Sequence, residues 1–152
     1  MATRIEEQPV GCSNFKLRQL TRRVSQFYDR ELGRIGLKTT QYSLLSHVMR
    51  LGPVQPAELA RAMTIDASTL TRNLKPLVDA GWIAISAGSD ARSRRVAITE
   101  AGRTKRNEGQ RRWKAAQEAL NLLLGVDQVV ALHALIDRSL ERFGTLELRP
   151  HA

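Results

Sequence analysis

The sequence predicts a mainly α-helical domain that carries one small β-hairpin, and two patterns lead to this fold class. Along most of the chain, apolar residues recur at intervals of three or four, which is the period of an amphipathic helix. Between Trp82 and Thr99 the interval changes to two on both sides of a polar loop, which is typical of two paired strands. A chain of 152 residues that is 42% apolar fits a single domain, residues 1–152, with a core of its own.

The first two helices are predicted over residues 13–35 and 39–51. Gly33 and Gly36 mark the end of the first helix, and Gly52 and Pro53 stop the second, which Thr39 is expected to cap. The apolar stripe of the first helix is Leu17, Leu20, Val24, Phe27, Leu32 and Ile35, and that of the second is Leu44, Leu45, Val48 and Met49.

A short helix is then predicted to begin at Pro56, because proline suits the first position of a helix and Glu58 favours the positive end of the helix dipole. A break follows at residues 64–66. Asp66 is expected to cap the next helix, which runs from about Ala67 to Asp79. The inner face of the short helix is Leu59, Ala60 and Met63.

Residues 82–86 and 95–99 form the two strands of the predicted hairpin, joined by the polar loop 87–93. Thr99 is expected to cap a long helix that ends near Leu124, where Gly125 breaks it. Asp127 is expected to cap the last helix, whose apolar face is Val129, Leu132, Leu135, Ile136, Leu140 and Phe143.

The chain is strongly basic, with 24 lysines and arginines against 15 acidic residues and a formal charge of +9. Excess positive charge favours polyanions, and nucleic acid is the commonest soluble polyanion. A merely soluble basic protein would have the same charge, and the excess is spread along the whole chain, so charge alone does not locate a site.

The sequence also bears on compartment and chemistry. A single cysteine cannot form an internal disulfide, no run of eighteen apolar residues could span a membrane, and residues 1–10 lack the apolar stretch of a secretory signal. We therefore expect a cytoplasmic protein. His47, His133 and His151 lack metal-ligand spacing, and there is no glycine-rich phosphate loop or nucleophile motif. We expect neither metal nor cofactor, and no enzymatic activity.

A short helix, a three-residue break, a second helix and a hairpin form the layout of a winged helix-turn-helix. The helical period of the segment 67–79 places Leu70, Leu74, Leu77 and Val78 on one side. The opposite side carries groups that bond base edges and phosphates in a major groove. These residues are Ser68, Arg72, Lys75 and Asp79, flanked by Thr69 and Thr71, with Asn73 nearer the core edge. A solvated amphipathic helix is the alternative, and Pro76 is expected to kink this helix.

The tip of the hairpin is the second basic feature, because Arg92, Arg94 and Arg95 fall within four residues. A narrow minor groove attracts inserted arginines. Asp90 is expected to hold the Arg92 guanidinium by a bidentate hydrogen bond and so to fix its direction. The alternative is a solvated charged turn.

Three segments resemble the MarR family of bacterial regulators. They are residues 56–60 (PAELA), 68–74 (STLTRNL) and 90–102 (DARSRRVAITEAG), and the last is the most specific. The resemblance implies a homodimer that represses nearby genes until a small molecule or an oxidant releases it. It implies a DNA-binding lobe at 37–102 and a helical dimerisation region at 11–36 and 103–146. It also implies that the outer residues of the helix 67–79 lie in the major groove of duplex DNA, and these are Ser68, Thr69, Thr71, Arg72, Asn73 and Lys75. Arg92, oriented by Asp90, is expected to enter the minor groove. The operator of such a homodimer is expected to be pseudo-palindromic.

Two kinds of effector remain open. Cys12 is a candidate redox sensor, because a thiolate at the start of a helix is stabilised, and hydroperoxide-sensing members of the family carry a cysteine there. Tyr28 and Tyr42 are its candidate partners. Alternatively, a small aromatic anion contacts Tyr42, His47 and Trp113, the last of which has arginines beside it. A winged-helix adaptor that binds protein and has no DNA target is the alternative function.

Overall fold

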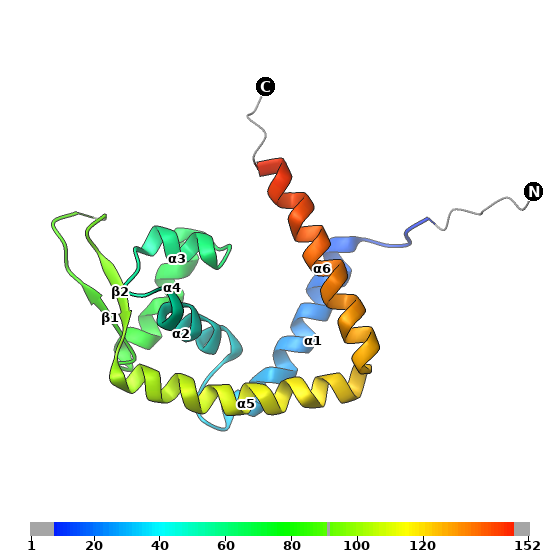
Figure 1. Cartoon of the computed structure of the whole chain (residues 1–152), viewed down its shortest axis with the longest axis horizontal. Helices are drawn as coiled ribbons and strands as arrows, with labels where there is room; N and C mark the ends of the chain where they lie inside the picture. The colour runs from blue at the N-terminus through cyan, green and yellow to red at the C-terminus, as the bar shows by residue number, and fades with distance from the viewer. Residues whose placement is uncertain (1–7, 91, 148–152) are drawn as a thin grey trace, which may run out of the picture.

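The computed structural model describes residues 8–90 and 92–147, which form six helices and one two-stranded antiparallel sheet. The helices are α1 (Ser13–Gly33), α2 (Thr39–Leu51), α3 (Pro56–Ala62), α4 (Ala67–Asp79), α5 (Glu100–Leu124) and α6 (Val126–Glu147), and the strands are β1 (Ile83–Ser86) and β2 (Arg95–Ile98). Figure 1 shows α2, α3, α4 and the hairpin gathered into a lobe at one end of α5, while α1 and α6 rise from its other half. The predicted fold class is confirmed. Both ends of the predicted domain lie outside the described residues. So do His151 and, in the wing, Ala91.

The main core fills the lobe. Leu44, Leu45 and Val48 of α2 are fully buried as predicted, and Leu32 extends the core into α1. Burying one such leucine is worth about 1.5–3 kcal/mol. The remaining buried members of this core are Leu37, Tyr42, Val54, Leu59, Ala60, Leu70, Leu74, Leu77, Ile83 and Val96. The lobe is therefore packed onto the end of α1 rather than separate from it.

The turn between α3 and α4 is tight. Met63 is the C-cap residue that follows α3. Thr64 has a φ of 54°, in the left-handed region that a β-branched residue rarely adopts. Asp66 caps α4 by accepting a hydrogen bond from the backbone N–H of Thr69, as predicted. The helix runs through Pro76 to Asp79, so the proline does not end it. Val78, which the helical period places on the same side as the buried leucines, is 37% exposed at the edge of a groove beside the wing.

The hairpin is paired from Ile83 opposite Ile98 to Ser86 opposite Arg95, and Val54 adds a bridge to Val96. Each strand is one residue shorter than predicted. Trp82 and Thr99 instead belong to the junction with the helices, where the backbone N–H of Thr99 donates to the carbonyl of Trp82.

The last two helices meet at Gly125, which has a φ of 86°. The chain bends there by 105° between α5 and α6. Because α6 already begins at Val126, Asp127 lies in its first turn and does not cap it, contrary to the prediction. A second, small core of Tyr28, Ala116 and Leu120 joins α1 to α5.

The predicted apolar face of α6 is mostly uncovered. Val129 is buried, but Leu135, Ile136, Leu140 and Phe143 are exposed. Within the described residues, no single helix is long and apolar enough to cross a membrane, and only the strongly bent pair of α5 and α6 reaches that length and hydropathy together.

Candidate nucleic-acid interface

Helix α4 lies on the surface of the lobe with one face in the core. Leu70, Leu74 and Leu77 are buried, whereas Ser68, Thr71, Arg72 and Lys75 are exposed. Thr69 and Asn73 are half-buried at its margins. The geometry expected from the helical period is therefore present, with hydroxyl, guanidinium and ammonium groups on the outer face.

Asp66 organises the first turn of α4. Its carboxylate accepts hydrogen bonds from the Ser68 hydroxyl at 2.6 Å, the Thr69 backbone N–H at 2.7 Å and the Thr69 hydroxyl at 2.9 Å. These bonds, above all that from Ser68, hold the pKa of Asp66 well below its usual range. The carboxylate therefore stays charged, and both hydroxyls are held in fixed directions.

The next turn is also ordered by contacts within the helix. The Thr71 hydroxyl donates to the carbonyl of Ala67 at 2.9 Å, and Arg72 Nη2 donates to Thr69 Oγ1 at 3.3 Å. Lys75 Nζ lies 2.9 Å from Asp79 Oδ2. The hydroxyl hydrogens of Ser68, Thr69 and Thr71 are thus used inside the protein, while their oxygens retain acceptor capacity.

Asp90 has a different role from the one expected at the wing tip. Asp90 and Arg92 are both described, and no ion pair joins them. The carboxylate of Asp90 instead accepts from the backbone N–H of Ser93 at 2.9 Å, and the Ser93 hydroxyl donates to the carbonyl of Asp90 at 2.9 Å. Asp90 therefore closes the turn rather than holding Arg92, because the backbone of Ser93 is the nearer donor.

The three wing arginines are not equivalent. Arg95 Nη1 donates to the carbonyls of Arg92 at 2.7 Å and Arg94 at 2.9 Å, so its guanidinium braces the wing. The side chains of Arg92 and Arg94 are exposed and have no hydrogen bond or ion pair with another described residue. Arg94 borders the same groove as Lys75, so the wing and the outer face of α4 meet on one side of the lobe.

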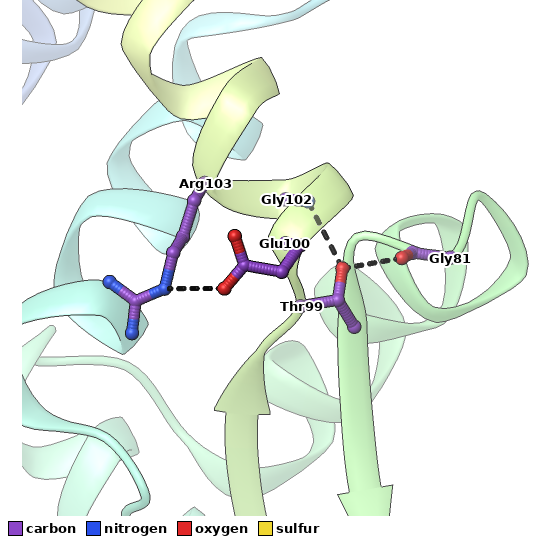
Figure 2. Close-up of polar contacts among 5 residues, drawn as sticks. All are labelled: Gly81, Thr99, Glu100, Gly102 and Arg103. Atoms are coloured by element: carbon purple, nitrogen blue, oxygen red, sulfur yellow. Dashed lines mark hydrogen bonds and ion pairs between the residues drawn. The ribbon is translucent and has the colours of Figure 1, made fainter.

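The base of the wing is tied to α5 through Thr99, as Figure 2 shows. The Thr99 hydroxyl donates to the carbonyl of Gly81 at 2.7 Å and accepts from the N–H of Gly102 at 3.0 Å. A Cβ atom at Gly102 would lie 2.0 Å from the carbonyl oxygen of Trp82, so only glycine fits there. The threonine and glycine at the end of the wing motif therefore fix how the hairpin meets α5.

Two clefts flank the outer face of α4. On the wing side is an apolar groove of about 530 Å³, bordered on α4 by Leu74, Lys75 and Val78 and on the wing by Ile85 and Arg94. On the other side is a polar cleft of about 140 Å³ between α4 and the start of α2. Its lining is Lys38, Thr40, Gln41, Arg72, Asn73 and Pro76. Sequence reasoning missed the α2 residues, because only the packing of α2 against α4 brings them to this face.

The structure brings some of the candidate effector residues together and leaves others apart. Cys12 is exposed at the start of α1, whereas Tyr28 lies more than four helical turns further along the same helix. Tyr28 donates to Gln117 Oε1, and burial raises the pKa of its hydroxyl. Tyr42 is buried and stacks on Trp113 with ring centroids 6.4 Å apart. The structure therefore does not bring either tyrosine beside Cys12.

His47 Nδ1 lies 2.8 Å from the carbonyl of Ser43, one turn earlier on the same helix. Among residues 8–90 and 92–147, no three histidine, cysteine, aspartate or glutamate side chains gather as metal ligands would.

Comparison with known proteins yields a consistent set of similarities. The sequence profile of the MarR family matches residues 35–93. YwoH, an uncharacterized HTH-type transcriptional regulator of Bacillus subtilis, is 28% identical over 93 residues, which are 61% of this chain and 68% of that protein. The structure of the M. tuberculosis transcriptional regulator MosR matches 88% of this chain and 98% of its own, with 28% identity and a TM-score of 0.70. MosR has also been crystallised in complex with DNA. A mutant E. coli MarR complexed with operator DNA shares the fold, with a TM-score of 0.73 at 22% identity over 84% of this chain and 92% of its own.

The helix α4 exposed beside a β-hairpin, after a short helix and a tight turn, defines a winged helix-turn-helix protein. The profile match and the similarity to MosR extend this class to a family. Residues 35–93 match the MarR family of transcriptional regulators, and the fold as a whole is similar to that of MosR, as the resemblance predicted. That family is not one of enzymes, in agreement with the prediction.

Proposed function

We propose that this protein binds a specific duplex DNA sequence as a homodimer and represses transcription from it. The observation that carries the proposal is the common orientation of α4 and the wing. Lys75 of α4 and Arg94 of the wing border one groove, so the cations of both elements lie on one side of the lobe. A surface of this kind suits a helix in the major groove and a wing beside it.

The outer face of α4 would read bases with two kinds of group. Ser68, Thr69 and Thr71 donate their hydrogens within the protein, so they offer oxygen acceptors to the amino groups of adenine and cytosine. Arg72 offers donors that match the O6 and N7 atoms of guanine, with Asn73 and Lys75 beside it. The relatives that have been crystallised with DNA support DNA binding by this fold.

The wing would contact the minor groove through Arg92 and Arg94, whose side chains are free of other described residues. Arg95 would act indirectly, because its guanidinium holds the backbone carbonyls of the wing tip. Asp90 would act indirectly as well, by closing the turn that carries Arg92.

The same proposal includes the homodimer, the release of DNA by an effector, and a cytoplasmic location. The uncovered apolar residues of α1 and α6 support dimerisation through the helical region. A small aromatic anion or an oxidant would release the DNA. Half-buried Trp113, with exposed Arg111 beside it, would contact such an anion.

Cys12 would sense the oxidant, because its thiol is exposed and can form a sulfenic acid and then a disulfide with another thiol. We expect an organic hydroperoxide to dissociate the wild-type complex and dithiothreitol to restore it, while Cys12→Ser stays bound. Equal dissociation of both proteins would exclude Cys12 as the sensor and favour the anion.

DNA binding itself is tested by fluorescence anisotropy with labelled random duplex across a salt series, followed by sequencing of the fragments that the protein retains. We expect binding that falls linearly on a logarithmic salt scale and a retained pseudo-palindromic sequence. Absence of salt-dependent binding at low salt would instead favour the protein-binding adaptor.

A further inference from the structure

The polar cleft between α2 and α4 has no role in the function described so far. It is lined at the start of α2 by Lys38, Thr40 and Gln41, of which Lys38 directly precedes the helix, and on α4 by Arg72, Asn73 and Pro76. None of these residues is acidic, and two are cations. Its volume is about 140 Å³. A cleft of that size is too small for most organic ligands but large enough for a phosphate group and its waters.

The side of the cleft formed by α2 is held in place by contacts outside it. The backbone N–H and the hydroxyl of Thr39 both donate to Asp29 Oδ1 at 2.7 Å, which fixes the first turn of α2 against α1. The backbone N–H of Lys38 donates to Gln41 Oε1 at 2.9 Å, which leaves the amide NH₂ of Gln41 as a donor. The ammonium of Lys38 and the hydroxyl of Thr40 are exposed beside it.

The cleft also lies where a DNA backbone would pass. Along α4, the wing-side groove borders Thr71, Lys75 and Val78, whereas the cleft borders Arg72, Asn73 and Pro76. The outer face of α4 lies between these two sets. A helix in the major groove, which is about 12 Å wide, has one sugar-phosphate strand on each side. The strand on the α2 side would therefore run over the cleft.

We propose that Lys38, Thr40 and Gln41 bind one phosphate of the DNA backbone and so set the depth and register of α4 in the major groove. This inference rests on the proposed DNA binding. The ammonium of Lys38 supplies the charge, and Thr40 and Gln41 supply neutral donors. Contacts of this kind position a protein on DNA and carry no base information themselves.

The test is the salt dependence of binding by Lys38→Gln. Each phosphate neutralised contributes about 0.9 to the slope of log affinity against log salt. We expect Lys38→Gln to reduce the slope by about that amount for each bound subunit, and to weaken all operator variants by the same factor. Lys38→Arg, which keeps the charge, should retain the wild-type slope.

Lys114→Gln is the matched control, since it removes the same charge from an exposed lysine of α5 that does not line the cleft. It should keep the wild-type slope, and circular dichroism should confirm that both variants fold. A wild-type slope in Lys38→Gln would overturn the inference, as would a changed base preference, which would mean that Lys38 reads a base. Failure of the wild type to bind DNA would instead overturn the proposed function.

Discussion

Asp66 has a large influence on the surface of α4 although it is not one of the residues proposed to contact DNA. It caps the helix, and it also holds the hydroxyls of Ser68 and Thr69. Because hydrogen bonds lower its pKa, the ionised form of Asp66 stabilises the folded state above the ordinary value of 3.8, and this contribution is lost as the pH falls below it. At neutral pH the first turn of α4 is therefore ordered before any ligand arrives.

Arg72 is the residue on which base preference should depend most. Replacing it with alanine removes the only guanidinium on the outer face of α4. A bidentate contact to guanine is worth about 1–3 kcal/mol. We expect Arg72→Ala to lose that much affinity and to tolerate substitutions at one operator base pair. Anisotropy with a set of single-base operator variants measures this. An equal loss on every variant would make Arg72 a phosphate contact.

Asp90→Ala should weaken DNA binding although it removes a negative charge from a basic surface. Its carboxylate closes the wing turn through Ser93, and without it Arg92 loses its fixed position. Asp79→Ala is the control, because it removes the same charge from the outer face of α4 and frees Lys75. This control should bind at least as tightly as the wild type. If both variants bind more tightly, the wing turn has no positioning role.

At the scale of the elements, the junction between the wing and α5 is the most constrained contact. A methyl group at Gly102 would meet the carbonyl oxygen of Trp82, which is backbone and cannot rotate away. We expect Gly102→Ala to lower the free energy of unfolding by about 1–3 kcal/mol, the usual cost of overpacking, and to weaken DNA binding by displacing the wing. Urea denaturation at constant m-value measures the stability loss.

Gly33→Ala is the control for that substitution, because Gly33 is also in a helix and an added methyl group there would have no atom within 4 Å. Alanine there should stabilise the protein by about 0.5–1 kcal/mol. Equal stability of Gly102→Ala and the wild type would show that α5 shifts freely against the hairpin.

The elements were predictable where the signals are local. Helix periods, the caps Asp66 and Thr99 and the glycine breaks lie within a few residues of the boundaries that they determine, so α3, α4 and α5 were predicted closely. The outer face of α4 followed from the same period. The partner of Asp90 was predicted wrongly, because it depends on how the hairpin turn folds. The exposure of Val78 beside the wing was not predicted, because it depends on how the hairpin packs. The cleft at Lys38 depends on the packing of α2 against α4, which no local pattern encodes.

On the scale of the whole molecule, most apolar residues of α6 are left uncovered by the rest of the chain. Leu140 is 60% exposed and Phe143 is 66% exposed, and Leu135 and Leu146 are similar. Clustered apolar surface of this kind marks an interaction site. We expect light scattering at micromolar concentration to give about twice 17.0 kDa. Footprinting should then show two half-sites about one helical turn of DNA apart.

Replacing Leu140 and Phe143 together with glutamate should give a monomer with an intact lobe and weak operator binding. Gln128→Glu is the control, since it adds a negative charge at an exposed polar position of the same helix. A monomeric wild type that still protects both half-sites would contradict this prediction.

The two cores of the molecule differ greatly in size, and this difference affects how the chain exchanges its amide hydrogens. The lobe has a large buried cluster, whereas only Tyr28, Ala116 and Leu120 are buried where α1 crosses α5. Regions with few buried contacts open at low free energy, and their amides exchange with solvent first. In dilute solution the amides of α6 and of the start of α1 should therefore lose their protection from exchange, while the amides of the lobe stay protected. As the protein concentration rises, mass action should restore the protection of α6 and α1. The arrangement of two lobes on one DNA molecule would then depend on the amount of protein, while each lobe stays folded.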